Sequence, residues 1–229
     1  MAAGFRIYTR VKRPPLSLAD AFLPYSTCNI ADNMGRMFCM DAGIKPVRED
    51  AKLAGIAFTV KTRPGDNLLV HKALDMAEPG DVIIVDARGD MTNAILGEIM
   101  ARYALKRGLR GLVVDGAVRD WAGIKRLDLP VFARGASPRG PYKDGPGEIN
   151  VPVSCGGVTV FPGDVIVGDA DGVVVIPAGE AEEILRKTRE VALREQAIFR
   201  QVEEGTWDRG WIDEILRQKG CEILETLWS

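Results

Sequence analysis

Short apolar runs alternate with helical patterns through the first half of the chain. Residues 53–62, 81–87 and 111–115 are rich in Val, Ile and Leu and are bounded by turn residues, which is typical of strands covered on both faces. Residues 65–81 and 97–108 repeat apolar side chains at intervals of three and four, which predicts amphipathic helices. Strand–helix–strand units of this length favour parallel pairing with right-handed crossovers. The pattern therefore predicts an α/β fold.

The pattern changes after Pro130, where five short apolar stretches lie between Gly, Pro and Asp residues. They read PVFARG, INVPVSC, GVTVFPGD, DVIVGDADG and GVVVIP. Such stretches predict an antiparallel sheet or a small barrel, with a hairpin turn at residues 168–172. A long, charged helical pattern then covers residues 179–205.

The end of the chain is unusually apolar. It contains Trp207, Trp211, Leu216, Ile223, Leu224, Leu227 and Trp228. Apolar side chains so late in a chain usually pack onto the parent domain or a neighbouring subunit. We expect three regions along the chain. The first is an irregular arm over residues 1–50, in which Ser17 would cap a short helix; this arm would pack on the core or on a neighbour. The second is an α/β core over residues 51–178, and the third is a helical extension over residues 179–229 that we expect to contact another subunit.

Composition and charge restrict the function classes. The 229 residues are 46% hydrophobic and 27% charged, which is ordinary for a globular protein with a sizeable core. A net charge of -2 provides no global attraction to nucleic acid or to an anionic membrane, so neither is an expected partner. The four cysteines are scattered, with no C-x-x-C and a single histidine in the chain, which argues against a zinc site. Without a recognisable secretory signal, we expect reduced thiols and a cytoplasmic protein.

Charged residues gather after a predicted buried strand. Arg119 and Asp120 follow the strand at 111–115, and Glu98 precedes Arg119 by twenty intervening residues, at the start of the helix at 97–108. If this strand pairs in parallel with the preceding one, the loops that follow both strands open at the same edge of the sheet. Ligands of open α/β sheets bind at that edge. The spacing therefore indicates a candidate site.

Two interpretations of this group remain open on spacing alone. As a site, Asp120 and Glu98 offer oxygen ligands for Mg²⁺ or Mn²⁺, Arg119 offers a clamp for a carboxylate, and the helix start offers unpaired N–H groups. As ordinary structure, Glu98 is an acid favoured by the helix dipole, while Arg119 and Asp120 cap the following helix.

Two other features of the sequence bear on function. The segment 137–150 is turn-rich, and we expect it to be flexible; its Arg139 and Lys143 could face an anionic substrate. His71 lies in an amphipathic helix, where a structural polar contact is favoured over a catalytic role.

Longer segments of the sequence resemble a known family. The order and spacing of four segments resemble the family of the RraA proteins and the class II 4-hydroxy-4-methyl-2-oxoglutarate aldolases. These segments are GEIM, RGLRGLVVDGAVRD, FARGASPRG and GGVTVFPGDVIVGDADGVVVIP. The resemblance covers roughly residues 50–205. It implies a three-layer α/β/α swivelling-type (RraA-like) fold, assembled as trimers or as hexamers of two trimers, with active sites between subunits.

The resemblance also implies roles for the candidate residues. Asp120 would bind a divalent metal directly and Glu98 through water, although Glu98 stands where the aldolases usually have Asp. Arg119 would contact the substrate. The pyruvyl carboxylate would be held by the backbone of Gly97, Glu98, Ile99 and Met100.

Two further transfers concern more distant parts of the chain. Lys143 falls where the family has a lysine near the site, and Glu195 falls where a neighbouring subunit contributes an acid, there bound to the metal through water. The activity implied is a lyase that cleaves 4-hydroxy- or 4-carboxy-2-oxo acids to pyruvate, with the charge of the enolate taken up by Mg²⁺ or Mn²⁺. The alternative is an RraA-like regulator that binds an RNA-processing enzyme without catalysis.

Overall fold

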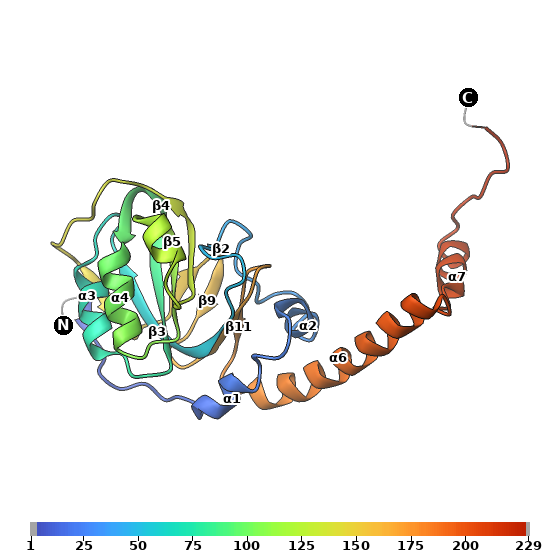
Figure 1. Cartoon of the computed structure of the whole chain (residues 1–229), viewed down its shortest axis with the longest axis horizontal. Helices are drawn as coiled ribbons and strands as arrows, with labels where there is room; N and C mark the ends of the chain where they lie inside the picture. The colour runs from blue at the N-terminus through green and yellow to red at the C-terminus, as the bar shows by residue number, and fades with distance from the viewer. Residues whose placement is uncertain (1–3, 228–229) are drawn as a thin grey trace. The chain divides into compact units, whose positions relative to one another are not determined.

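Four parallel strands form the centre of the molecule in a computed structural model, which describes residues 4–227. They are β3 (Leu53–Thr62), β4 (Asp81–Leu96), β5 (Gly111–Val118) and β6 (Val131–Ala136), side by side in chain order. The helices that connect them are α3 (Leu68–Met76), α4 (Glu98–Lys106) and α5 (Trp121–Lys125). Asp86 of β4 lies opposite Asp115 of β5, so the predicted parallel pairing and the mixed α/β class are confirmed (Figure 1).

Most of the strands after Pro130 extend this sheet instead of forming a separate one. The free edge of the ten-residue strand β3 pairs antiparallel with β10 (Val165–Gly168) at one end and with β7 (Gly147–Ile149) at the other. One edge strand of three residues, β1 (Phe5–Ile7), pairs with β7, and β2 (Lys45–Pro46) pairs with β6. Because β3 is long, its edge accommodates two short strands in line.

The remaining strands form two hairpins. β11 (Val173–Ile176) pairs antiparallel with β10, and the predicted turn at residues 168–172 joins them. β8 (Val153–Cys155) and β9 (Val158–Val160) form a separate two-stranded sheet.

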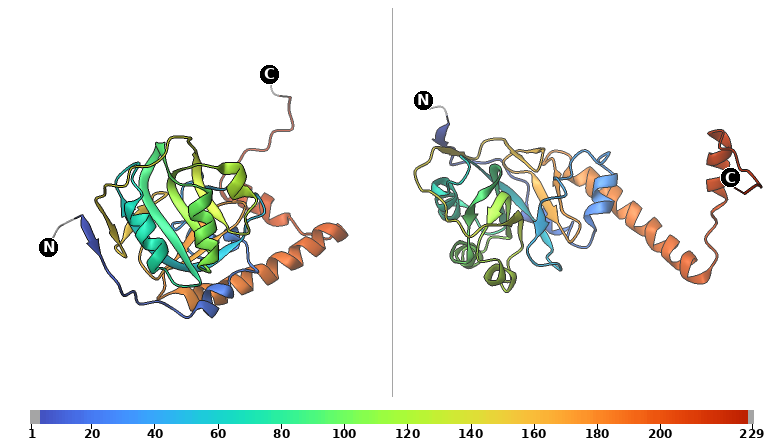
Figure 2. Two further views of the ribbon diagram at one scale, coloured as in Figure 1. Left: turned by 60° about the vertical axis from the view of Figure 1, so that its left-hand side comes forward. Right: turned by 90° about the horizontal axis from the view of Figure 1, so that it is seen from above.

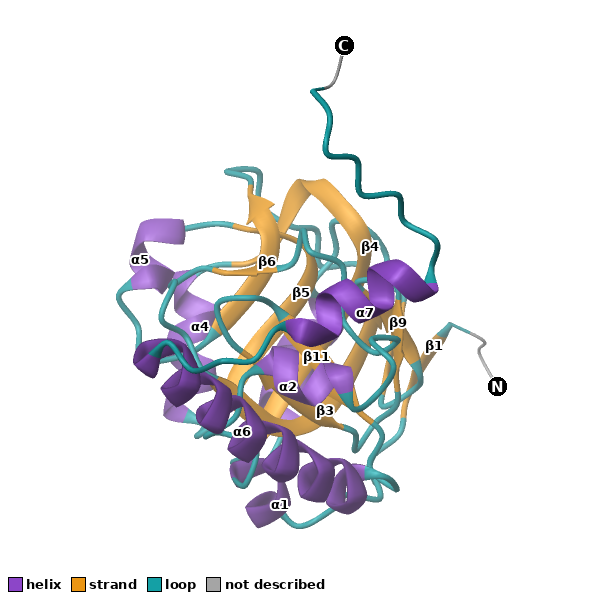
Figure 3. Cartoon of the chain, turned by 90° about the vertical axis from the view of Figure 1, so that its right-hand side faces the viewer, coloured by secondary structure: helices purple, strands orange, loops and turns teal. Residues whose placement is uncertain are grey.

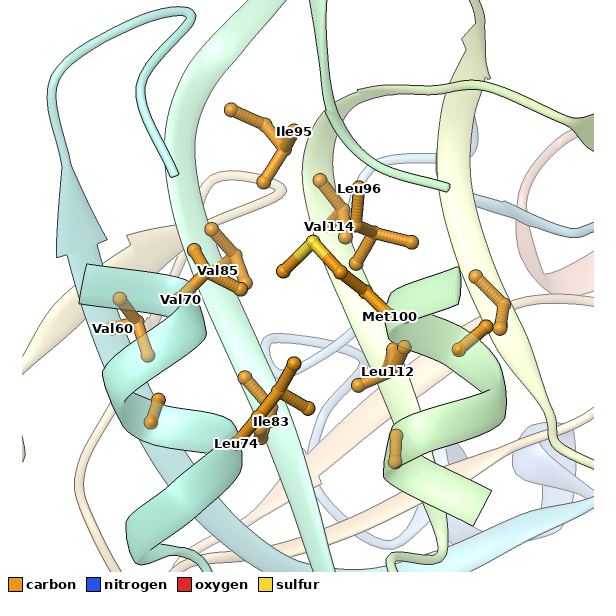
Figure 4. Packing of buried hydrophobic residues seen from close by; sticks show 14 of the residues in the cluster. Val60, Val70, Leu74, Ile83, Val85, Ile95, Leu96, Met100, Leu112 and Val114 are labelled. Carbon is orange, nitrogen blue, oxygen red and sulfur yellow. The ribbon is translucent and has the colours of Figure 1, made fainter. Parts of the chain in front are cut away.

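Helices α3 and α4 cover one face of the central strands side by side (Figure 2, left). The core between them is aliphatic: Val70 and Leu74 of α3 and Met100 of α4 meet Val85 and Val114 of the sheet (Figure 4). The hairpin β8–β9 packs with Met40, Ile44 and Ala51 against residues such as Ile84 and Phe132 of the sheet. The short helices α1 (Leu16–Asp20) and α2 (Thr27–Asp32) and the first turns of α6 (Ala181–Glu204) pack around β10 and β11.

Two local expectations from the sequence are wrong. The strand predicted over residues 81–87 continues to Leu96 as β4, which passes through left-handed turn conformations at Arg88 and Gly89 and shifts register against β5. Ser17 lies inside α1 and does not cap it, because the helix begins one residue earlier, after Pro15. The side chain that caps a helix in this arm is Ser26, whose Oγ accepts from the N–H of Asn29 at the start of α2.

The described residues fall into two compact units, 4–189 and 190–227. The second unit contains most of α6 and the helix α7 (Gly210–Gln218), which has no buried residue. Its exposed large apolar residues are Leu193, Ile198, Phe199, Val202, Trp207, Trp211, Ile215, Ile223, Leu224 and Leu227. Trp228 lies outside the described residues. None of the helices found within 4–227 combines the length and apolar character that a bilayer crossing requires.

Candidate functional site

The start of α4 and the Arg119–Asp120 pair meet at the carboxyl ends of β4 and β5. The N–H of Arg119 donates to the carbonyl of Leu96, the last residue of β4, at 2.9 Å. The N–H of Glu98, the first residue of α4, donates to Oδ2 of Asp120 at 3.1 Å. Since α4 and α5 follow neighbouring strands, they also lie next to each other (Figure 3). The shared edge inferred from spacing therefore exists.

Asp120 stabilises a helix that is not its own. It occupies the N-cap position of α5 with a left-handed backbone (φ 57°), yet its side chain makes no capping bond to that helix. Instead its carboxylate accepts from the first N–H of α4, a donor that has no partner within the helix. The second carboxylate oxygen, Oδ1, accepts no hydrogen bond from any residue in 4–227, and the side chain is 47% exposed.

Two glycines make room for Arg119. An added Cβ on Gly97 would lie 2.9 Å from Cγ of Arg119 and closer still to Oδ2 of Asp120. One on Gly140 would lie 3.0 Å from Nη1 of Arg119. The side chain is 43% exposed, and its Nε lies 3.9 Å from Oδ2 of Asp120. Arg119 therefore keeps most of its hydrogen-bonding capacity for a ligand.

The carboxylate of Glu98 is turned toward other partners. Oε1 accepts from Nε and Nη2 of Arg102 at 2.8 and 2.5 Å, one helical turn further along α4. The carboxyl group also lies against Gly123 of α5, where an added Cβ would be 2.5 Å from its Cδ. Glu98 thus contributes its backbone N–H to the meeting point with Asp120, while its carboxylate belongs to an ion pair on the helix surface.

A cavity of about 200 Å³ opens beside this meeting point. It is lined by Asn67, His71, Leu96, Gly97, Ile99, Met100, Arg119, Asp120, Pro141 and Lys143. Of the predicted site residues in the first unit, Glu98 and Arg139 do not line it. Two cationic side chains, Arg119 and Lys143, face one carboxylate, and the start of α4 adds its partial positive charge. The cavity therefore suits a small anion.

The segment that carries Lys143 is held firmly, whereas the sequence predicted flexibility. Asp66 is fully buried, and its Oδ2 accepts from the N–H groups of Asp144 and Gly145 at 2.8 and 2.9 Å. The N–H of Tyr142 donates to the carbonyl of Gly65 at 2.8 Å. These bonds fix Lys143 at the cavity wall. Arg139, the other basic residue expected here, is not among the residues that line the cavity.

Asn67 and His71 complete the wall on the side of α3. Asn67 is 2% exposed; its Nδ2 donates to the carbonyl of Ile95 at 2.8 Å, and its Oδ1 is buried with no hydrogen-bond partner among residues 4–227. Partial burial lowers the pKa of His71, and Lys143 lowers it further, whereas Asp75 acts in the opposite direction. Sequence reasoning missed Asn67; His71 was considered, but only the folded 141–146 segment shows that it lines the cavity.

The donor set around the cavity can accommodate a divalent ion only in a particular way. Within residues 4–227, no group of three or more His, Cys, Asp or Glu side chains is arranged to hold a metal. One exposed carboxylate oxygen, Oδ1 of Asp120, is available. Mg²⁺ commonly keeps several waters and uses one or two carboxylates. Asp120 therefore fits a weakly held, largely hydrated ion that a bound substrate would help to coordinate.

Glu195 lies on the part of α6 that belongs to the second unit. Its assignment to the site of a neighbouring subunit stays a prediction.

The chain matches the RraA-like family model (Aldolase/RraA) over residues 27–175. A protein of Halalkalibacterium halodurans, provisionally named as a 4-hydroxy-4-methyl-2-oxoglutarate aldolase, is 45% identical over 179 residues, which cover 78% of this chain and 85% of the relative.

Solved structures of similar proteins agree with this match. The RNA-processing inhibitor RraA from Thermus thermophilus is 34% identical, with a TM-score of 0.62 over 66% of this chain and 92% of that one. Streptomyces coelicolor RraAS2, described as an unusual member of the RNase ES inhibitor RraA family, is 28% identical, with a TM-score of 0.75 over 82% of this chain and 98% of that one. The chain therefore belongs to the RraA-like family.

Proposed function

We propose that this protein is a divalent-metal-dependent lyase that cleaves 4-hydroxy- or 4-carboxy-2-oxo acids and releases pyruvate. The observation that carries the proposal is the cavity in which Arg119, Lys143 and the start of α4 face Asp120. Its size, about 200 Å³, suits a small acid. The aldolase name of the 45% identical relative supports the same reaction class.

The chain's own residues would bind and orient the substrate. The first N–H groups of α4, at Gly97, Ile99 and Met100, suit the carboxylate of a 2-oxo acid because they are unpaired within the helix. Arg119 would stabilise the negative charge that develops when the bond between C3 and C4 breaks. Lys143, fixed by the bonds of its segment to Asp66, would attract the second anionic group.

Asp120 would hold Mg²⁺ or Mn²⁺ directly, through its available Oδ1. When bound, such an ion acts as a Lewis acid that lowers the energy of an enolate. A contribution of Glu98 through water requires its carboxylate to leave Arg102. An exposed pair four residues apart on a helix contributes only about 0.3–0.5 kcal/mol, so this rearrangement costs little.

The second unit supports a homo-oligomer, which we propose to be a trimer or a hexamer. Its exposed apolar side chains, among them Trp211 and Ile215 of α7, form a surface that a monomer would leave in water. Glu195 would then reach the cavity of a neighbouring subunit. Light scattering of the full chain measures the mass, and the double variant Trp211→Glu, Ile215→Glu is expected to lower it. A monomeric wild type would rule out this part of the proposal.

The experiment that tests the activity measures pyruvate from 4-hydroxy-4-methyl-2-oxoglutarate and from oxaloacetate, with Mg²⁺, with Mn²⁺ and with EDTA. We expect pyruvate only with metal, and a loss of at least 100-fold in Asp120→Asn, which keeps the shape of the side chain but removes its charge. Lys125→Gln, on the exposed side of α5, is the matched control. Metal-independent or absent pyruvate release would refute the proposal.

The second candidate is a regulator that binds an RNA-processing enzyme, and it is favoured by the similarity to the Thermus thermophilus inhibitor. Capture of a purified ribonuclease or RNA helicase at one-to-one stoichiometry, together with no lyase activity, would support it over the enzyme.

A further inference from the structure

His71 is placed where a proton-transfer group for the proposed reaction has to be. It lines the same cavity as Arg119, Asp120 and Lys143, and it belongs to α3, which lies beside α4 (Figure 2). The cavity is small, about 200 Å³, so a ligand bound against Arg119 and Lys143 lies close to His71 as well. The imidazole is therefore within reach of a bound acid.

The surroundings of His71, an exposed residue of α3, lower the pKa of its ring. The charged groups that face it are Lys143 from the 141–146 segment, Asp75 from α3 itself, and Arg119 and Asp120 across the cavity. Partial burial and Lys143 both lower the pKa of the imidazole, and Asp75 only partly offsets them. A neutral imidazole can accept a proton, which a guanidinium group cannot do.

Cleavage of a 4-hydroxy-2-oxo acid needs such an acceptor. The hydroxyl proton on C4 leaves as the C4–O bond becomes a carbonyl, and the electron pair of the C3–C4 bond moves into C2–C3 to form the enolate of pyruvate. The enolate then takes one proton at C3. One group can perform both transfers, because the proton taken from the hydroxyl balances the proton given to C3, and no oxidant or reductant is needed.

We propose that His71 is the catalytic residue that accepts the C4 hydroxyl proton and returns it to C3 of the pyruvate enolate. This inference rests on the proposed lyase activity and adds a residue to it. The main chain that carries His71 is fixed in the first turn of α3, where its backbone N–H donates to the carbonyl of Asn67 at 3.0 Å.

The test compares His71→Asn with Lys72→Gln, an exposed neighbour on the same helix that does not line the cavity. In His71→Asn we expect kcat for cleavage of the hydroxy acid to fall at least 100-fold, with KM changed less than threefold. Oxaloacetate decarboxylation, which has no hydroxyl proton to remove, falls less than tenfold. Exchange of the C3 protons of pyruvate in D₂O, followed by NMR, slows with the cleavage reaction.

Two further measurements separate proton transfer from a structural role. The acid limb of the pH–rate profile is lost in His71→Asn, and imidazole added to His71→Ala restores cleavage. Equal losses for both substrates, or cleavage within threefold of the wild type, would overturn the role of His71 while the lyase activity stands. A wild type that forms no pyruvate from either substrate would overturn both the lyase activity and this role.

Discussion

Gly97 is the position where the smallest change should disable the candidate site. Its backbone is extended (φ -143°, ψ -168°), a conformation that alanine adopts without strain, so the effect of Gly97→Ala is steric. The new Cβ would lie 2.9 Å from Cγ of Arg119, whereas carbon atoms in contact prefer about 3.5–4.0 Å. Arg119, and Asp120 with it, must therefore retreat by roughly 0.6–1 Å.

This displacement has separate consequences for stability and for catalysis. The bond from the N–H of Glu98 to Oδ2 of Asp120, 3.1 Å long, lengthens beyond hydrogen-bond range, and the partly exposed pair loses about 1 kcal/mol. For a chain of this length that lowers Tm by roughly 2–4 °C. A displacement of about 1 Å in a catalytic group costs on the order of 100-fold in rate, so kcat should fall far more than the stability loss explains.

Pyruvate formation from oxaloacetate with Mg²⁺, followed by lactate dehydrogenase and NADH, measures the effect. Gly179→Ala is the matched control, because its Cβ would meet nothing within 4 Å. The reasoning would be refuted if Gly97→Ala folds normally and its kcat and Mg²⁺ dependence stay within threefold of the wild type. Activity would then not depend on the geometry of Arg119 and Asp120.

Three more predictions follow from single contacts. In Gly123→Ala the new methyl group forces the carboxylate of Glu98 away from α5. We expect Tm to change by less than about 3 °C, while the Mg²⁺ concentration for half-maximal activity shifts at least threefold. An unchanged Mg²⁺ concentration would show that Glu98 takes no part in metal binding. Asp66→Ala leaves buried N–H groups unpaired, so the free energy of unfolding in urea should fall by about 2–4 kcal/mol and amide exchange in residues 141–146 should become faster. Unchanged exchange would show that the carboxylate of Asp66 does not hold this segment. Burial raises the pKa of Asp81 to about 6, against the smaller opposing effects of the Glu78 N–H and Arg13, so protonation of this carboxyl should add up to about 3 kcal/mol to the free energy of unfolding as pH falls from 6 to 4. The variant Asp81→Asn should lack this contribution, and equal slopes of stability against pH in the wild type and the variant would refute it.

The centre of the fold could be predicted from the sequence because its strands are continuous apolar runs. Residues 53–62 were predicted as a strand and form β3 with the same bounds. The pairing of the next two strands follows from the helix between them. The extension of β4 to Leu96 could not be predicted in the same way, since Arg88 and Gly89 have positive φ values inside the strand and look like the start of a loop.

The candidate site could be predicted only as far as main-chain topology determines it. Strand order brings Arg119 and Asp120 to the start of α4, and spacing is enough to predict that. The rotamer of Glu98 depends on an ion pair with Arg102 of the same helix and on the closeness of Gly123 in α5, and the second of these is a contact between two helices. The inclusion of His71 depends on a segment seventy residues later, held by one buried carboxylate, and no local pattern indicates this.

The sheet ends on strands that are poor templates for another chain. Its main order begins at β1, with three residues, and finishes at β2, with two residues, one of them Pro46, which has no N–H to donate. The branch through β10 ends on the four-residue strand β11, whose outer edge is bonded to the backbone of Phe38 and Met40. The long strands that would aggregate most readily lie inside, paired on both edges. Copies of this protein should therefore associate through side chains and not through continued strand pairing, which favours closed assemblies over fibres.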